Sequence, residues 1–281
     1  MKHFYAYRIF LNQKIPNSQV KIEFKTKKES FIDFFIKIQE QQSITFSEYG
    51  EHVVIFEKKL GEDIYLLKLA KKQQFDKPTL EDGKIEDVKD VRYPNIYFLV
   101  HINKQIILIE KNTTVFQTMD AVKDKLVKVF TEEMIQDNVY CNLSEITDHR
   151  DFWEQIKDFD SVQKVELEYE PPNFFGGKNV ADRLVKDVHE ETNFDKFKII
   201  LRNKKEGLRF QYEDFKEHIQ RISQGAGNYI IEGIRDGADY IFTKKTKSHI
   251  RVDVPNIEEE SEESLETRFD EIENINDDED I

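Results

Sequence analysis

The chain has little cysteine, proline or glycine, and these shortages exclude several classes of protein. Its 281 residues include a single cysteine, Cys141, so the chain forms no internal disulfide, and no Cys/His cluster has the spacing of a zinc site. Six prolines and ten glycines are too few for a fibrous or low-complexity chain. Because chains without disulfides are typical of reducing compartments, we expect a cytoplasmic protein.

Long hydrophobic runs and catalytic motifs are missing as well. Residues 1–8 alternate polar and apolar side chains, unlike a signal peptide, and residues 96–102 form an apolar run too short to cross a bilayer. The chain contains no GxxxxGKS/T, GxGxxG, GxSxG or HExxH motif. We therefore predict no membrane insertion, no cofactor, no metal site and no catalytic residue, although an enzyme with an unrecognised site stays open.

Negative charge is abundant but concentrated at one end of the chain. There are 42 basic and 56 acidic residues, and 13 of the acids lie in residues 258–281 beside one cation, Arg268. Residues 1–257 therefore carry a net charge of only −2. A segment this acidic, with few apolar residues besides Leu265 and Phe269, is not expected to bury enough surface to become ordered. Residues 257–281 are predicted to be a disordered acidic tail.

Hydrophobic periodicity in the rest of the chain predicts an α+β fold in two modules, residues 1–147 and 148–256. Period-two alternation is typical of strands, and 3.6-residue spacing is typical of helices. Pro16-Asn17 and Asn103-Lys104 are the predicted hairpin turns of the first module. This module is expected to be mostly antiparallel sheet, with strands at 4–11, 20–24, 53–56, 64–69, 96–102 and 106–109 and helices at 30–41 and about 114–129.

The second module is predicted to begin with a short helix that carries the only tryptophan, Trp153. Asp236-Gly237 is the strongest short hairpin sequence in the chain. The glycines of Gly176-Gly177 and Gly225-Ala226-Gly227 are expected to end helices or turn the chain rather than to hold phosphate. The expected elements are helices at 148–158, 180–188 and 215–222 and β segments at 162–169, 197–201, 229–231, 240–242 and 250–254.

Two stretches of the second module are basic. Residues 196–209 hold six cations and one acid, and residues 242–251 hold four cations and no acid. Cations beside strand-borne aromatic residues suit a surface that follows phosphates, because neutralised phosphates release counterions without reading sequence. If both stretches lie on one face, they form a candidate interface for double-stranded DNA that comprises Arg202, Lys204, Lys205, Arg209, Lys244, Lys245, Lys247 and Arg251.

Other interpretations of these features stay open. The cations could form a solvated face whose lysines prevent edge-to-edge pairing of strands. Glu166 and Glu168, near Asp160, could hold Mg²⁺ in a nuclease, but alternating carboxylates more often face solvent. The acidic tail could compete with DNA and so inhibit binding, or it could only improve solubility. A protein-interaction subunit without nucleic-acid contact is the main alternative function.

The order of these segments resembles that of the RexA-type phage-exclusion proteins and the related KwaB-type bacterial defence proteins. Residues 4–8 resemble the aromatic-rich first strand of that family, and residues 93–100 with 106–110 resemble its Pro-led hairpin. Residues 165–169, 180–188 and 196–202 are similar in order to its later half.

The resemblance spans residues 3–254 and implies a cytoplasmic, dimeric protein of a phage-defence system that binds DNA with little sequence preference. A partner effector protein fits the same picture. The resemblance transfers no catalytic residue to this chain. The acidic tail departs from the pattern of a simple DNA binder.

Overall fold

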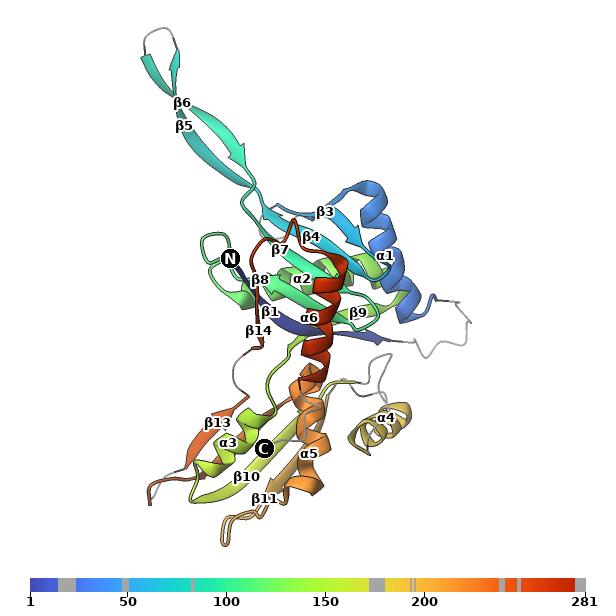
Figure 1. Ribbon diagram of the computed structural model, residues 1–281, viewed down its shortest axis with the longest axis vertical. Helices are drawn as coiled ribbons and strands as arrows, with labels where there is room; N and C mark the ends of the chain where they lie inside the picture. Colours follow the sequence, from blue (N-terminus) through green and yellow to red (C-terminus); the bar gives the residue numbers. More distant parts are fainter. Residues whose placement is uncertain are drawn as a thin grey trace.

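The computed structural model confirms an α+β fold, drawn out along one axis, with a two-stranded arm at one end (Figure 1). It describes residues 1–14, 24–46, 51–81, 84–171, 180–192, 194, 196–237, 241–246 and 249–275. The predicted turn at Pro16-Asn17, most of the strand at 20–24 and the pair Gly176-Gly177 lie outside these ranges. Within them, no helix is both long enough and apolar enough to span a membrane.

An eight-stranded antiparallel sheet forms the middle of the molecule. Its strand order is β14-β1-β8-β7-β4-β3-β2, and β9 pairs with the second half of β1. β7 and β8 form the predicted hairpin, although their turn spans residues 102–105 rather than two residues. The strands are β1 (Lys2–Gln13), β2 (Ser43–Phe46), β3 (His52–Leu60), β4 (Ile64–Lys71), β7 (Asn95–His101), β8 (Ile106–Glu110), β9 (Val139–Glu145) and β14 (Arg251–Val254).

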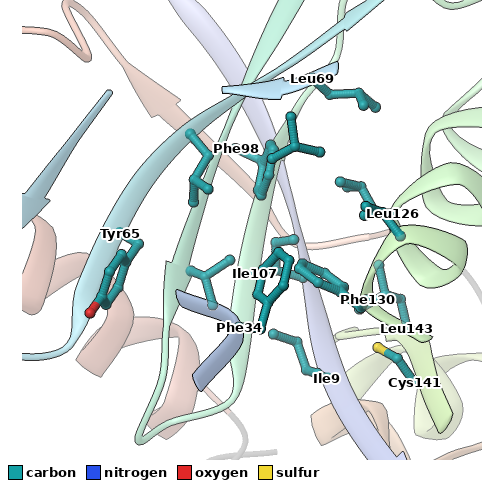
Figure 2. Close-up of a cluster of buried hydrophobic side chains, with 14 of the residues drawn as sticks. Ile9, Phe34, Tyr65, Leu69, Phe98, Ile107, Leu126, Phe130, Cys141 and Leu143 are labelled. Atoms are coloured by element: carbon teal, nitrogen blue, oxygen red, sulfur yellow. The ribbon is translucent and has the colours of Figure 1, made fainter. Parts of the chain in front are cut away.

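Two helices cover one face of this sheet. α1 (Lys27–Gln41) begins with a capping box, in which the Thr26 hydroxyl accepts from the Glu29 N–H and the Glu29 carboxylate accepts from the Thr26 N–H. α2 (Met119–Met134) is followed by a short 3-10 helix, η1 (Ile135–Asp137). Phe34 of α1 and Phe130 of α2 pack edge to face, with ring centroids 5.1 Å apart, in the core that Figure 2 shows.

Both faces of the central strands are buried. Ile107 and Ile109 of β8 lie in the core under α1 and α2, whereas Ile106 and Leu108 lie in a second core on the opposite face. Residues of β4 and β7 divide between the two cores in the same way. These strands therefore read as continuous apolar runs rather than as an alternation.

The acidic C-terminal segment covers the second core. α6 (Glu262–Asn274) buries Leu265, Phe269 and Ile272 against the sheet, which it crosses in Figure 1. The predicted disorder of the tail is therefore wrong for residues 262–274, and residues 276–281 lie outside the described ranges. Three apolar residues at i, i+4 and i+7 are too few to form a core of their own, but they form one helix face that fits an apolar sheet already in place.

Polar contacts hold α6 at the turn between β7 and β8. Lys104 Nζ lies 2.9 Å from carboxylate oxygens of both Glu266 and Asp270. The His101 ring accepts the Lys104 N–H at Nδ1 and donates from Nε2 to Glu266 at 3.1 Å. Burial lowers the pKa of His101, as does the charge of Lys104. Burial alone would raise the pKa of Glu266, but the hydrogen bond from Lys104 and the nearby positive charges hold it below its usual value.

A four-stranded antiparallel sheet, in the order β11-β10-β12-β13, forms the second module. Its inner face packs against Phe152 and Trp153 of α3, Val185 of α4 and Ile219 of α5. The elements are α3 (Arg150–Lys157), β10 (Ser161–Tyr169), α4 (Val180–Thr192), β11 (Phe197–Arg202), α5 (Tyr212–Arg221), the π-helix η2 (Ile222–Ala226), β12 (Gly227–Ile234) and β13 (Phe242–Lys245).

The second module is inserted into the first. After β13 the chain returns to the eight-stranded sheet, where β14 pairs with β1 in the register Lys2↔Val254 and Tyr5↔Arg251. The expected module boundary at residue 256 therefore differs from the structure, in which residues 251–275 complete the first module.

The two modules meet where η2 approaches β1 and β9. The Arg8 guanidinium donates to the Gln224 carbonyl at 3.0 Å and to the Lys104 carbonyl at 2.6 Å. Gly225 has φ +90°, and a Cβ at this position would lie 2.6 Å from the Arg8 Cβ and 3.2 Å from the Ser144 carbonyl oxygen. The prediction that Gly225 turns the chain is confirmed, and the close approach requires glycine.

The projecting arm consists of β5 (Gln73–Glu81) and β6 (Lys84–Arg92), which pair only with each other (Figure 1). This arm is not predicted from the sequence, because charged residues interrupt the alternation and Pro78 disfavours a strand. Leu80 and Ile85 face each other near its tip and are 72% and 75% exposed.

Replacement of the main α6 anchor tests whether the acidic segment is part of the fold. We expect Phe269→Ala to lower the free energy of unfolding by about 3 kcal/mol, because it leaves a cavity under a fully buried ring. Glu271→Ala, at an exposed position of the same helix, is the control and should change it by less than about 0.5 kcal/mol. Urea titration measures both; equal effects would contradict the docked helix.

The environment of His101 predicts a loss of stability in mild acid. Its pKa is lowered in the folded state, so the unfolded chain binds the extra proton, and the stabilisation present above about pH 6.5 declines as pH falls below that value. Glu266, whose folded pKa is also lowered, loses its contribution only below about pH 4.5. The stability advantage of wild type over His101→Gln, measured by urea unfolding, should therefore shrink between pH 7.5 and 5.5. An advantage independent of pH would count against this account.

Substitutions at two glycines distinguish the cost of backbone strain from the cost of disturbing the contact between the modules. Both Gly225 and Gly237 have positive φ, but nothing lies within 4 Å of a Cβ added at Gly237. Gly237→Ala should cost about 1 kcal/mol from its backbone conformation alone. Gly225→Ala should cost clearly more in the same thermal unfolding measurement, because its Cβ also meets β1 and β9. A similar cost for both would mean that the junction is loosely packed.

Candidate nucleic-acid interface

The outer face of the four-stranded sheet carries a mixture of charges. Side chains alternate along the second half of β10, so Lys164, Glu166 and Glu168 point away from the core while Val165, Leu167 and Tyr169 are buried. The register places Lys164 between Arg202 of β11 and Glu232 of β12. Positive and negative groups are therefore mixed on this face, which does not form a continuous basic surface.

Lysines neutralise the two carboxylates at the centre of this face. Glu166 lies 2.8 Å from Lys198 and 3.3 Å from Lys164, and Glu168 lies 2.7 Å from both Lys196 and Lys198. The hydrogen bond from Lys198 lowers the pKa of Glu166. Burial alone would raise the pKa of Glu168, but its two lysine partners lower it. Lys196 and Lys198 of the first basic stretch are thus occupied by acids of β10.

The same pairing bears on the magnesium hypothesis. Glu166 and Glu168 would have to exchange their lysine partners for Mg²⁺, and Asp160 accepts from the Gly237 N–H at 2.9 Å instead of joining them. Across the parts of the chain that the structure describes, no group of three or more His, Cys, Asp or Glu side chains is placed to hold a metal ion.

The turn after β11 has a defined conformation. The Asn203 side-chain oxygen accepts from the N–H groups of Lys205 and Glu206, both at 3.2 Å, which forms an Asx turn. Gly207 follows with φ +79°, and a Cβ there would lie 2.4 Å from the Ser161 hydroxyl oxygen. Neither residue is among the predicted turn formers, although Asn and Gly are the residues that such turns select.

This turn presents the cations that remain unpaired. Arg202, Lys204, Lys205 and Arg209 are exposed, and none of them has an ion-pair partner among the described residues. We call residues 202–209 the cationic turn. Glu206 is its one acid.

The second basic stretch does not join the cationic turn. Lys245 is exposed on β13, whereas Arg202 is on β11, and these strands are the opposite edges of the sheet, separated by β10 and β12. Lys244 also belongs to β13, but its side chain, like all of Lys247, lies outside the described residues. Of the second basic stretch, Lys245 is the basic member of the sheet whose side chain the structure describes, and it is not brought together with the cationic turn.

Arg251 lies in a different sheet from the other candidates. It belongs to β14 of the first module and forms an ion pair with Asp253 at 2.8 Å, which raises the pKa of Arg251 and lowers that of Asp253 to about 2. Its guanidinium also approaches the His3 ring at 2.8 Å. The expectation that Arg251 joins the other cations is therefore wrong, because the chain leaves the second module before residue 251.

A shallow hollow of about 270 Å³ opens beside Lys245. Its charged lining combines Glu145, Glu166 and Glu168 with Lys198 and Lys245. Three carboxylates against two ammonium groups disfavour a polyanion here.

Comparisons with known proteins do not extend this picture. No protein-family model matches the chain, and no curated protein matches it.

Proposed function

We propose that this protein binds double-stranded DNA with little sequence preference through the cationic turn, as a component of a phage-defence system. The observation that supports the proposal is that Arg202, Lys204, Lys205 and Arg209, in and beside one Asx turn, are exposed without ion-pair partners among the described residues. Unpaired cations release the counterions of phosphates at little cost, whereas paired ones must first give up a carboxylate. The place in phage defence comes from the resemblance to the RexA-type family.

The proposed interface is smaller than the sequence suggests. Four cations can neutralise only a few phosphates, so binding should be weak at physiological salt and strongly salt-dependent. Such binding is independent of sequence because it contacts the backbone and no base edge. A second copy of the turn, presented by a dimer, would add affinity through an effective local concentration.

Residues 262–274 are docked on the first module, so they do not form a free acidic tail that could inhibit DNA binding. Leu265, Phe269 and Ile272 hold this helix on the first module, and Lys104 pairs with two of its carboxylates. Removal of the tail would expose an apolar sheet face instead of releasing a competitor. Point substitutions in the cationic turn are therefore the better test.

The alternative function, a protein-interaction subunit, is favoured by one observation. The arm formed by β5 and β6 carries exposed apolar residues far from any core, which is unusual unless a protein surface covers them. This alternative concerns a different part of the molecule, so the two functions are compatible.

Fluorescence anisotropy with a labelled random-sequence duplex tests DNA binding. Wild type should bind at low salt, and log affinity should fall by about 0.9 for each neutralised phosphate per unit of log salt concentration. The variant Lys204→Gln/Lys205→Gln should bind more weakly, with a salt slope reduced by about two neutralised phosphates.

The double variant Lys84→Gln/Lys186→Gln is the matched control. It removes the same two charges at exposed positions of β6 and α4. It should retain wild-type affinity and slope. Absence of wild-type binding at low salt, or equal losses in both double variants, would refute the proposed interface.

A further inference from the structure

The arm is the least supported part of the described structure. A two-stranded hairpin alone is marginally stable in water, and nine-residue strands extend it over about 30 Å. Leu80, Ile85, Val88 and Val91 are all more than 40% exposed on it. The part of the chain that the structure describes leaves these residues open to a further surface.

The charge of the arm excludes nucleic acid as that surface. Residues 73–92 hold six acidic and four basic side chains. A net negative ribbon is repelled by phosphates, although a two-stranded ribbon has the right width for a DNA groove. The arm therefore has a different binding role from the cationic turn.

Cross-strand partners define which residues share a face of the arm. The register pairs Leu80 with Ile85 and Gln74 with Val91. We call the face that holds these pairs the arm face; it comprises Gln74, Asp76, Pro78 and Leu80 of β5 and Ile85, Asp87, Lys89 and Val91 of β6.

The β6 residues of the arm face are complementary to the same residues of a second copy that runs in the opposite direction. It reads apolar, acidic, basic, apolar in the order Ile85, Asp87, Lys89, Val91. If two arms stack with antiparallel β6 strands about a two-fold axis at Val88, Ile85 lies over Val91 of the other copy and Asp87 lies over its Lys89. The two-fold symmetry repeats each contact. The β5 halves then place Leu80 over Gln74 and Pro78 over Asp76, with no like charges opposed.

The opposite face of the arm does not have this property. The same stacking there would place Lys84 over Arg92, which are like charges. Its groups are also occupied within the arm, since Lys77 lies 3.6 Å from Asp90 and Arg92 lies over the Phe75 ring. By contrast, Asp87 and Lys89 are exposed and have no ion-pair partner among the described side chains.

We propose that a second copy of this chain covers the arm face, and that two arms stack antiparallel through Ile85–Val91 and Asp87–Lys89 contacts. The contact is isologous and closed, so it gives a dimer and not a filament. It is small compared with standard protein interfaces, so we expect reversible dimerisation that weakens at high salt. The two bodies lie at opposite ends of the stacked arms.

Charge reversal with rescue tests the proposal, with sedimentation velocity of the full chain over a range of concentrations as the readout. Wild type should dimerise. Asp87→Lys and Lys89→Asp each place like charges opposite one another twice per dimer, and each should raise the dimer Kd about tenfold or more. The swap Asp87→Lys/Lys89→Asp restores the complementary order and should regain dimerisation.

A mixture of the two single variants provides an independent result. The Asp87→Lys chain presents two cations and the Lys89→Asp chain presents two anions, so an equimolar mixture should form heterodimers while neither variant self-associates. Lys84→Asp, on the opposite face of the arm, is the control and should dimerise like wild type. Far-ultraviolet circular dichroism confirms that each variant folds.

Two results would overturn the proposal. One is a wild-type chain that stays monomeric at all concentrations, and the other is a dimer whose Kd is unchanged by either single reversal or not restored by the swap. DNA binding by the cationic turn is measured separately, so either proposal can fail without the other.

Discussion

The burial of a second sheet face by α6 is the contact on which the first module depends. The apolar residues of β4, β7 and β8 divide between two cores, and only one of these cores is covered by α1 and α2. Without Leu265, Phe269 and Ile272 the other face would be an exposed apolar surface in the middle of the molecule. The high acidity of the C-terminal segment is compatible with this role because its carboxylates lie on the outer side of the helix or pair with Lys104.

The same contact changes how the charge of the molecule is interpreted. A free acidic tail would act on any basic surface within reach, whereas a docked helix keeps its charge at a fixed place. The remaining charges of the second module then largely compensate one another, as Lys196 and Lys198 do with the carboxylates of β10. What is left over is the cationic turn at one end of the molecule and the acidic arm at the other (Figure 1).

Sequence reasoning identified the elements whose pattern is local. The helix at 30–41, the hairpin of β7 and β8 and the alternating strand β10 follow from periodicity, and all are present. It failed where the outcome depends on distant partners. α6 orders only because a sheet already offers an apolar face, and Arg251 leaves the second module because β14 completes a strand order set by residues 2–5.

The candidate site shows the same division. The cations of residues 202–209 could be picked out by composition, but their separation from Lys245 follows from the strand order β11-β10-β12-β13, which no local pattern encodes. The neutralisation of Lys196 and Lys198 likewise depends on the register between β10 and β11. The composition of the sequence therefore identifies the charged residues, whereas the topology of the sheet determines which of them remain available to bind a partner.

The insertion of the second module between β9 and β14 has a consequence for how the chain is made. Elements of the first module lie on both sides of the inserted module in the sequence, so β14 and α6 are synthesised after it. During translation the nascent sheet must therefore wait, with the face of Ile106 and Leu108 uncovered, until residues 262–274 have emerged from the ribosome. The inserted module, whose described strands and helices lie between residues 150 and 245, has been synthesised before then, so it is able to fold while that face is still uncovered.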